Sequence, residues 1–112
     1  MISSRFPYLT VNVNVGGLSL VESALLDTGF NWDFAIPVSR SIGMQPVRRE
    51  WIMLASGREE DALVFTGNIQ LGDLEPVPAE IIAMGSNFVI GTGILRHYEV
   101  ILDHGQRVIV NL

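Results

Sequence analysis

The chain has 112 residues, of which 48% are apolar and 17% charged, with 11 Gly, 5 Pro and no Cys. This length and apolar fraction predict one compact domain over residues 1–112, and the lack of Cys excludes disulfides and Cys-ligated metals. Seven Arg, no Lys and 12 acidic residues give a formal charge of −5. That balance argues against a nucleic-acid partner, because phosphate binding needs a basic stripe.

Several other classes of protein are disfavoured by the composition. Residues 1–8 lack the apolar core of a signal peptide, and no apolar run approaches the roughly 20 residues that span a bilayer. We therefore expect no membrane partner and, by default, a cytoplasmic location. Only two His and no Cys argue against a metal site, and a chain without Lys has no Lys-bearing phosphate loop, so no cofactor is expected.

The first 26 residues predict a β-hairpin. Residues 8–15 alternate between polar and apolar side chains, which is the period of a half-buried strand. Gly16 and Gly17 can supply the positive φ angles of a tight turn, and residues 18–26 form the return strand. The hairpin therefore delivers the chain to Asp27.

The middle of the chain predicts short strands separated by turns. Phe34–Ile36 is an apolar stretch closed by Pro37, and residues 39–43 fit one helical turn. Apolar segments at 51–54 and 62–65 flank the polar residues 55–61, which predicts a protruding hairpin with a mobile tip.

The next segment predicts a further strand pair. Residues 68–71 alternate and Gly72-Asp73 turns the chain. Pro76 and Pro78 bracket a strand that runs to residue 83, and prolines at that place suggest a sheet edge.

The last quarter predicts a strand, a helix and a hairpin. The run Phe88–Ile90 ends at Gly91, and residues 94–98 fit a short helix capped by the Thr92 hydroxyl. Strands at 100–102 and 108–110 flank a loop of hairpin length. About eight short strands and one or two helical turns predict an all-β barrel or sandwich.

The candidate for chemistry is Asp27-Thr28-Gly29, directly after the apolar strand end Ala24-Leu25-Leu26. The strand presents a carboxylate on a turn, where the glycine allows close approach of backbone. The tripeptide alone also fits ordinary turn chemistry.

The order of motifs along the chain supports a functional role for Asp27-Thr28-Gly29. Leu26-Asp27-Thr28-Gly29, the glycine-bearing hairpin at Ser56-Gly57 and Phe88-Val89-Ile90-Gly91 follow one another at appropriate spacings. The chain thus resembles, over nearly its whole length, the retropepsin-like aspartic proteases of the small prokaryotic single-domain type. The resemblance implies an all-β, closed-barrel-like acid protease fold with one or two short helices.

The resemblance also implies an aspartic endopeptidase without a cofactor. One motif per chain supplies one carboxylate, so two copies would form a homodimer with an Asp27 from each at the two-fold axis. The pair would share one proton and activate a water against a peptide bond. Thr28 would brace the two loops and Gly29 would offer backbone to the peptide or protein substrate. The tip Ala55, Ser56 and Gly57 would form a flap, with Phe30 and Ile90 in the substrate pocket.

Alternatives remain at several positions. Many family members carry Ala or Ser where Phe30 stands, so this ring either narrows a subsite or packs inward. Phe30 and a flap with a single glycine also fit an inactive peptide-binding or dimerisation module of the same fold. Asp33, between aromatic residues, is expected to face solvent. The alternating C-terminal strand, residues 107–112, is a candidate dimer contact.

Overall fold

The computed structural model describes residues 1–54 and 56–112. Strands dominate it, with one 3-10 turn and one helical turn. In chain order the elements are β1 (Ile2–Ser3), β2 (Tyr8–Val15), β3 (Leu18–Leu26), β4 (Phe34–Ile36), η1 (Val38–Arg40), β5 (Arg48–Met53), β6 (Glu59–Leu71), β7 (Val77–Ala83), β8 (Val89–Ile90), α1 (Thr92–Leu95), β9 (Glu99–Asp103) and β10 (Arg107–Asn111). Neither helical segment of the described chain has the length and apolar character to cross a membrane.

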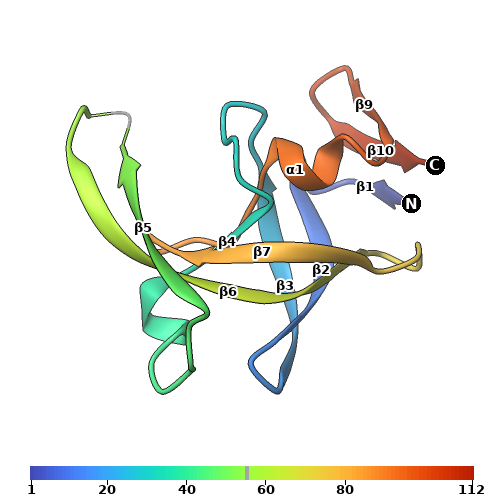
Figure 1. Ribbon diagram of the computed structural model, residues 1–112. Helices are drawn as coiled ribbons and strands as arrows, with labels where there is room; N and C mark the ends of the chain where they lie inside the picture. Colours follow the sequence, from blue (N-terminus) through green and yellow to red (C-terminus); the bar gives the residue numbers. More distant parts are fainter. Residues whose placement is uncertain (55) are drawn as a thin grey trace.

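Most strands form a closed barrel. The strand order β2-β3-β8-β4-β7-β6 returns to its start because β2 also pairs with β6. β5 extends this sheet beyond the ring and forms with β6 a hairpin that stands away from the barrel (Figure 1). A second sheet, in the order β1-β10-β9, lies at the opposite end of the molecule (Figure 1). The predicted all-β, closed-barrel-like fold is confirmed.

The first hairpin forms as its sequence predicts. β2 buries each of its apolar positions, and its strand bounds match those expected from the alternation. Gly16 and Gly17 have φ of +58° and +81°, values that only glycine adopts without strain at both positions of a tight turn. The turn between β9 and β10 also has two residues with positive φ, His104 at +52° and Gly105 at +65°.

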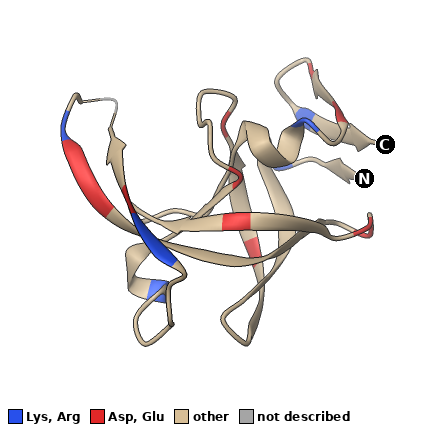
Figure 2. Ribbon diagram, in the orientation of Figure 1, with Lys and Arg blue, Asp and Glu red and all other residues tan. Residues whose placement is uncertain are grey.

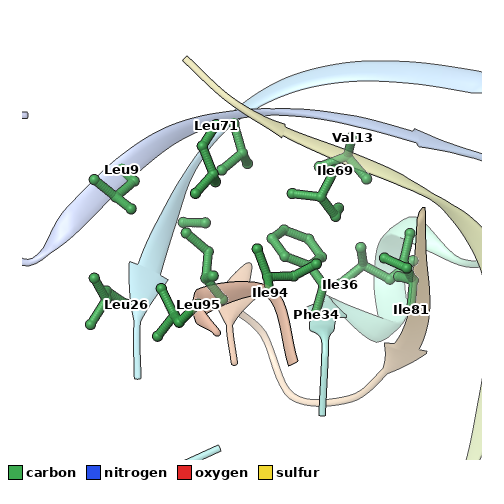
Figure 3. Close-up of a cluster of buried hydrophobic side chains, with 14 of the residues drawn as sticks. Leu9, Val13, Leu26, Phe34, Ile36, Ile69, Leu71, Ile81, Ile94 and Leu95 are labelled. Atoms are coloured by element: carbon green, nitrogen blue, oxygen red, sulfur yellow. The ribbon is translucent and has the colours of Figure 1, made fainter. Parts of the chain in front are cut away.

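The barrel interior is filled by aliphatic side chains with Phe34 and Phe65, drawn from both halves of the chain (Figure 3). Removing this apolar surface from water is the main source of stability. α1 joins the core through its own side chains, so the turn that follows β8 is fixed to the barrel. The labelled members that meet in Figure 3 are Leu9, Val13, Leu26, Phe34, Ile36, Ile69, Leu71, Ile81, Ile94 and Leu95.

Two local predictions were wrong. β6 runs without interruption from Glu59 to Leu71, so the loop predicted over 55–61 is shorter and the predicted strands 62–65 and 68–71 are one. Thr92 begins α1 but does not cap it, because the N-cap is Gly91 and no side chain caps the helix.

The sheet edge predicted at the prolines is confirmed for the first half of β7. Among the described strands this half, which contains Pro78, pairs with β6 alone, whereas residues 81–83 also pair with β4.

The C-terminal strand, a candidate dimer contact, is the middle strand of its sheet. β10 is paired with β9 along its length and with β1 at Val108 and Ile109. The Met1 ammonium also donates to the Val110 carbonyl at 2.8 Å. Much of the backbone of β10 is therefore paired on both sides within its own chain, and its part in a dimer contact stays a prediction.

Candidate active site

Asp27 is presented at the end of β3 by a rigid backbone frame. β3 pairs in parallel with β8, Leu26 opposite Ile90. The Asp27 amide donates to the Ile90 carbonyl at 3.0 Å, and the Leu26 amide donates to the Pro7 carbonyl at 3.0 Å. The chain leaves the sheet only after these bonds, so the position of the Asp27 backbone is set by the barrel.

The Asp27 carboxylate is oriented by its own turn. The Gly29 amide donates to Asp27 Oδ1 at 2.9 Å, and the Phe30 amide donates to the Asp27 carbonyl at 3.2 Å. A Cβ on Gly29 would lie 3.2 Å from Oδ1, so glycine leaves room for this bond. No described residue donates to Oδ2, which leaves one carboxylate oxygen for chemistry.

Backbone hydrogen bonds connect the Asp27 loop (residues 27–33) to the start of α1. The Thr92 amide donates to the Phe30 carbonyl at 2.8 Å, and the Gly91 amide to the Asp33 carbonyl at 3.0 Å. A Cβ on Gly91 would lie 1.9 Å from the Trp32 carbonyl oxygen. Glycine is therefore needed here for close approach of two backbones, which gives the Val89-Ile90-Gly91 motif a physical reason.

Asp33 closes the same loop instead of facing solvent, so that sequence prediction was wrong. Its Oδ2 accepts a hydrogen bond from the Glu80 amide at 2.8 Å in a partly buried position. Its Oδ1 lies over Gly93, where a Cβ would approach it to 1.9 Å. Asp33 thus ties the Asp27 loop to β7 and to α1.

Two cavities share Asp27 on their walls, and we call them together the cleft. The larger, of about 430 Å³, extends from Asp27 to the inner part of the β5–β6 hairpin. The smaller, of about 150 Å³, extends from Asp27 toward the loop that precedes β8. Further residues on these walls are Phe30, Asn31, Trp32, Ala35, Trp51, Ile52, Met53, Leu54, Met84, Ser86, Asn87 and Val89.

The β5–β6 hairpin contributes to the cleft through residues below its tip. Trp51, Met53 and Leu54 line the larger cavity, whereas Ser56 and Gly57 lie exposed at the tip and are absent from its wall. Gly57 has φ of +85° and donates its amide to the Leu54 carbonyl at 2.9 Å, so the turn is local. Ala55, the third residue of the expected flap tip, lies outside the described residues.

Phe30 and Ile90 have different roles. Phe30 is half-buried and packs against the buried cluster that includes Ala35 and Ile82. It also lines both cavities, so its ring both packs inward and narrows the cleft. Ile90 has no exposed surface. It supports the Asp27 loop from the core, which differs from the expected place in the substrate pocket.

Thr28 faces away from the cleft. It lines a separate groove of about 370 Å³ between the Asp27 loop, α1 and β9, which we call the Thr28 groove. Successive residues of the motif therefore serve two different surfaces.

Charge around the site is unevenly distributed. Acidic and basic residues gather on the β5–β6 hairpin, while the central strands of the barrel carry few (Figure 2). Arg48 on β5 pairs with Glu80 on β7, and this ion pair lowers the pKa of the Glu80 carboxyl. Within residues 1–54 and 56–112 no group of three or more His, Asp or Glu side chains is placed to hold a metal ion.

Sequence reasoning missed the wall residues Trp32, Trp51, Met53 and Met84. Trp51 had a partial signal, because it stands in the apolar segment that flanks the predicted hairpin tip. Met84 had none, because its place beside Asp27 depends on the pairing of β7 with β4.

Comparison with known proteins supports the fold. A scan against protein-family models found no match, and a comparison with curated proteins found none either. Among solved structures, a retropepsin-like aspartic protease from Rickettsia conorii matches with a TM-score of 0.59 and 14% identity, over 98% of this chain and 88% of that chain. The Simian foamy virus (mac) protease matches with a TM-score of 0.54 and 17% identity, over 78% of this chain and 91% of that chain. What both share with this chain is the fold.

Proposed function

Starting from the retropepsin-like fold of this chain, we propose that it is an aspartic endopeptidase, active as a homodimer with one Asp27 from each copy. The observation that carries the proposal is the setting of Asp27: its Oδ1 accepts from the Gly29 amide at 2.9 Å, on the wall of the cleft. A carboxylate fixed by backbone in this way is pre-positioned for acid–base chemistry.

The proposed reaction needs two carboxylates because one must accept a proton while the other donates. At close range both cannot be ionised, so the pair holds one proton. The ionised Asp27 takes a proton from a water, and the water oxygen bonds to the scissile carbonyl carbon. The protonated Asp27 donates a hydrogen bond to the oxyanion that forms. The Asp27 that took the water proton then gives it to the amide nitrogen, the C–N bond breaks, and the amine leaves while the carbonyl re-forms as a carboxylic acid.

The cleft supports an extended peptide as the substrate. It runs from the hairpin past Asp27 to the loop before β8, and its walls combine apolar and aromatic side chains with polar groups. A peptide laid along it would present alternate side chains to the two sides, as an added strand does. Trp51, Met53 and Leu54 would cover the peptide from the hairpin, together with Ser56 and Gly57 if the tip closes.

Asp27→Asn is the direct test. We expect cleavage of an unfolded protein at mildly acidic pH to fall by at least about 10³-fold, the size typical of losing an acid–base catalyst. Cleavage would be followed by mass spectrometry of the products. Asp73→Asn, the same change at an exposed aspartate of the Gly72-Asp73 turn, is the matched control and should cleave like the unmodified chain.

Two results would contradict the proposal. Cleavage that survives in Asp27→Asn would assign the activity to another group or to a contaminant. A folded, self-associated chain that cleaves no unfolded protein between acidic and neutral pH, yet binds extended peptides, would identify a binding module with this fold.

A further inference from the structure

The two cavities of the cleft differ in how their walls are built. The larger, of about 430 Å³, is closed on one side by Trp51, Met53 and Leu54 of the β5–β6 hairpin. The smaller, of about 150 Å³, takes none of its described wall residues from the hairpin and lies between the Asp27 loop, β4 and the segment 84–89. Because the parts around the smaller cavity belong to the barrel, we expect it to keep its size when a peptide binds.

Backbone hydrogen bonds hold the far end of the smaller cavity, which is formed by residues 85–87. The Gly85 carbonyl accepts from the Val38 amide at 3.1 Å, and the Phe88 carbonyl accepts from the Leu25 amide at 2.9 Å. The two bonds attach this loop to other segments at both of its ends. The loop therefore cannot move outward to enlarge the cavity without breaking them.

The division between the two cavities is formed by side chains that line both of them. Besides Asp27, these are Phe30 and Met84. The Phe30 ring has a fixed place, because it packs against the buried cluster that contains Ala35, and a Cβ on Gly91 would lie 2.8 Å from its Cδ2. Met84 is unbranched and can change its rotamer. Phe30 is therefore the rigid part of the division.

We propose that Phe30 sets an upper size limit on one substrate side chain beside the cleaved bond. The inference rests on the proposed function and names the substrate class of the same site. Asp27 lies on the walls of both cavities, so the side chains next to the scissile bond are the ones that reach them. An apolar cavity of about 150 Å³ holds one benzene molecule. The smaller cavity thus admits valine, leucine or phenylalanine and excludes the larger indole of tryptophan.

The first test is the set of bonds that the chain cleaves in a synthetic peptide library with all residue types at each position, identified by mass spectrometry. In the unmodified chain, tryptophan should be at least about tenfold less frequent than leucine at one position next to the cleaved bond, because an oversized group does not fit a rigid pocket. Phe30→Ala should remove this depletion, since the two cavities then join.

Phe30→Leu and Phe88→Leu form a matched pair of variants. Phe88 is half-buried like Phe30 and adjoins the wall residue Val89, but its ring packs toward Phe34 in the core and lines neither cavity. Phe88→Leu should keep the depletion of tryptophan, and Phe30→Leu should weaken it. Phe30→Leu also retains an apolar side chain against the buried cluster, so it tests the inference if Phe30→Ala does not fold.

A second measurement needs no cleavage. Benzene and indole are added separately to isotope-labelled protein, and NMR follows the methyl signals of Ala35 and Val89, which line the smaller cavity. In the unmodified chain benzene should shift both signals, whereas indole should leave them nearly unchanged. In Phe30→Ala indole should shift them as well, and in Phe88→Leu it should not.

The outcomes separate this inference from the proposed function. Tryptophan that is as frequent as leucine on both sides of the cleaved bond overturns the size limit and leaves the Asp27→Asn test untouched. Indole that shifts the Ala35 and Val89 signals of the unmodified chain, or benzene that shifts neither, overturns it as well. A depletion that Phe88→Leu removes as fully as Phe30→Leu overturns the role of Phe30. If the unmodified chain cleaves no peptide, the proposed function fails, and the two probes still decide whether Phe30 limits the smaller cavity.

Discussion

The two walls of the cleft are built in opposite ways. The Asp27 loop is bound by backbone hydrogen bonds to β8 and α1, and it lies against Gly91 and Gly93, where a Cβ would approach other atoms to 1.9 Å. The β5–β6 hairpin has a tip closed by local bonds, and it exposes Trp51 and Met53. One wall is fixed by the barrel, and the other projects from it as a two-stranded hairpin that we expect to adapt. The proposed peptidase would benefit from this division, because it would hold its carboxylate still while admitting varied peptides.

The largest effect should come from filling the space under the fixed wall. Gly91→Ala places a methyl group against the Trp32 carbonyl and should lower the free energy of unfolding by about 3 kcal/mol or more. Gly57→Ala, on the adaptable wall, meets no atom within 4 Å and has only its φ of +85° to strain, so about 1 kcal/mol is expected. Chemical denaturation measures both. Equal losses would contradict the comparison.

The tie from Asp33 to β7 should come next. Asp33→Ala leaves the Glu80 amide without its partner, and we expect a loss of about 2 kcal/mol in the free energy of unfolding. Asp33→Asn keeps an acceptor oxygen of the same size and should lose less than half of that. If both variants are as stable as the unmodified chain, Asp33 does not hold the loop.

On the adaptable wall, Trp51→Ala should alter binding more than stability. The ring is 71% exposed, so the free energy of unfolding should change by less than about 0.5 kcal/mol. The KM for a peptide substrate should rise by about tenfold, because an aromatic contact with the peptide is lost. Ile42→Ala, at an isoleucine that is 81% exposed and outside the cleft walls, is the control and should leave KM unchanged.

The smallest effect concerns the ion pair at the base of the hairpin. Arg48 holds the pKa of the Glu80 carboxyl below its ordinary value of 4.5. The pair therefore stabilises the fold above that value, and its contribution disappears as pH falls through the lowered pKa. Glu80→Gln should be slightly less stable than the unmodified chain at pH 7 and equally stable in strong acid. Both side chains are exposed, so high salt should also reduce the difference.

Features encoded by neighbouring residues were predictable from the sequence. The β2–β3 hairpin follows from strict alternation and Gly16-Gly17, and the turn of Asp27 follows from a carboxylate two residues before a glycine. The order of the three motifs also predicted the fold class. Each of these depends on local backbone geometry or on a pattern that spans the chain.

Features set by packing between distant segments were not predictable. The sequence predicts that Asp33 faces solvent, but the pairing of β7 places the Glu80 amide within hydrogen-bond distance of its carboxylate. The sequence predicts that Ile90 lines the substrate pocket, but in the closed barrel this residue has no exposed surface. Gly57 led to the prediction that the hairpin tip contacts the substrate, whereas the cleft wall is formed by Trp51 and Met53, which precede the tip on β5. Register and closure decide these cases, and no single segment carries that information.

The placement of β10 between β1 and β9 of one chain separates folding from assembly. A solitary copy already pairs the central strand of its terminal sheet on both sides, so its native state should survive dilution. The proposed peptidase activity, by contrast, would be lost as the two copies dissociate, giving a rate that varies with the square of a low protein concentration. The expression level alone would then regulate the proposed activity. At low concentration the chains would stay folded but inactive, and activity would appear once the concentration is high enough for two copies to associate.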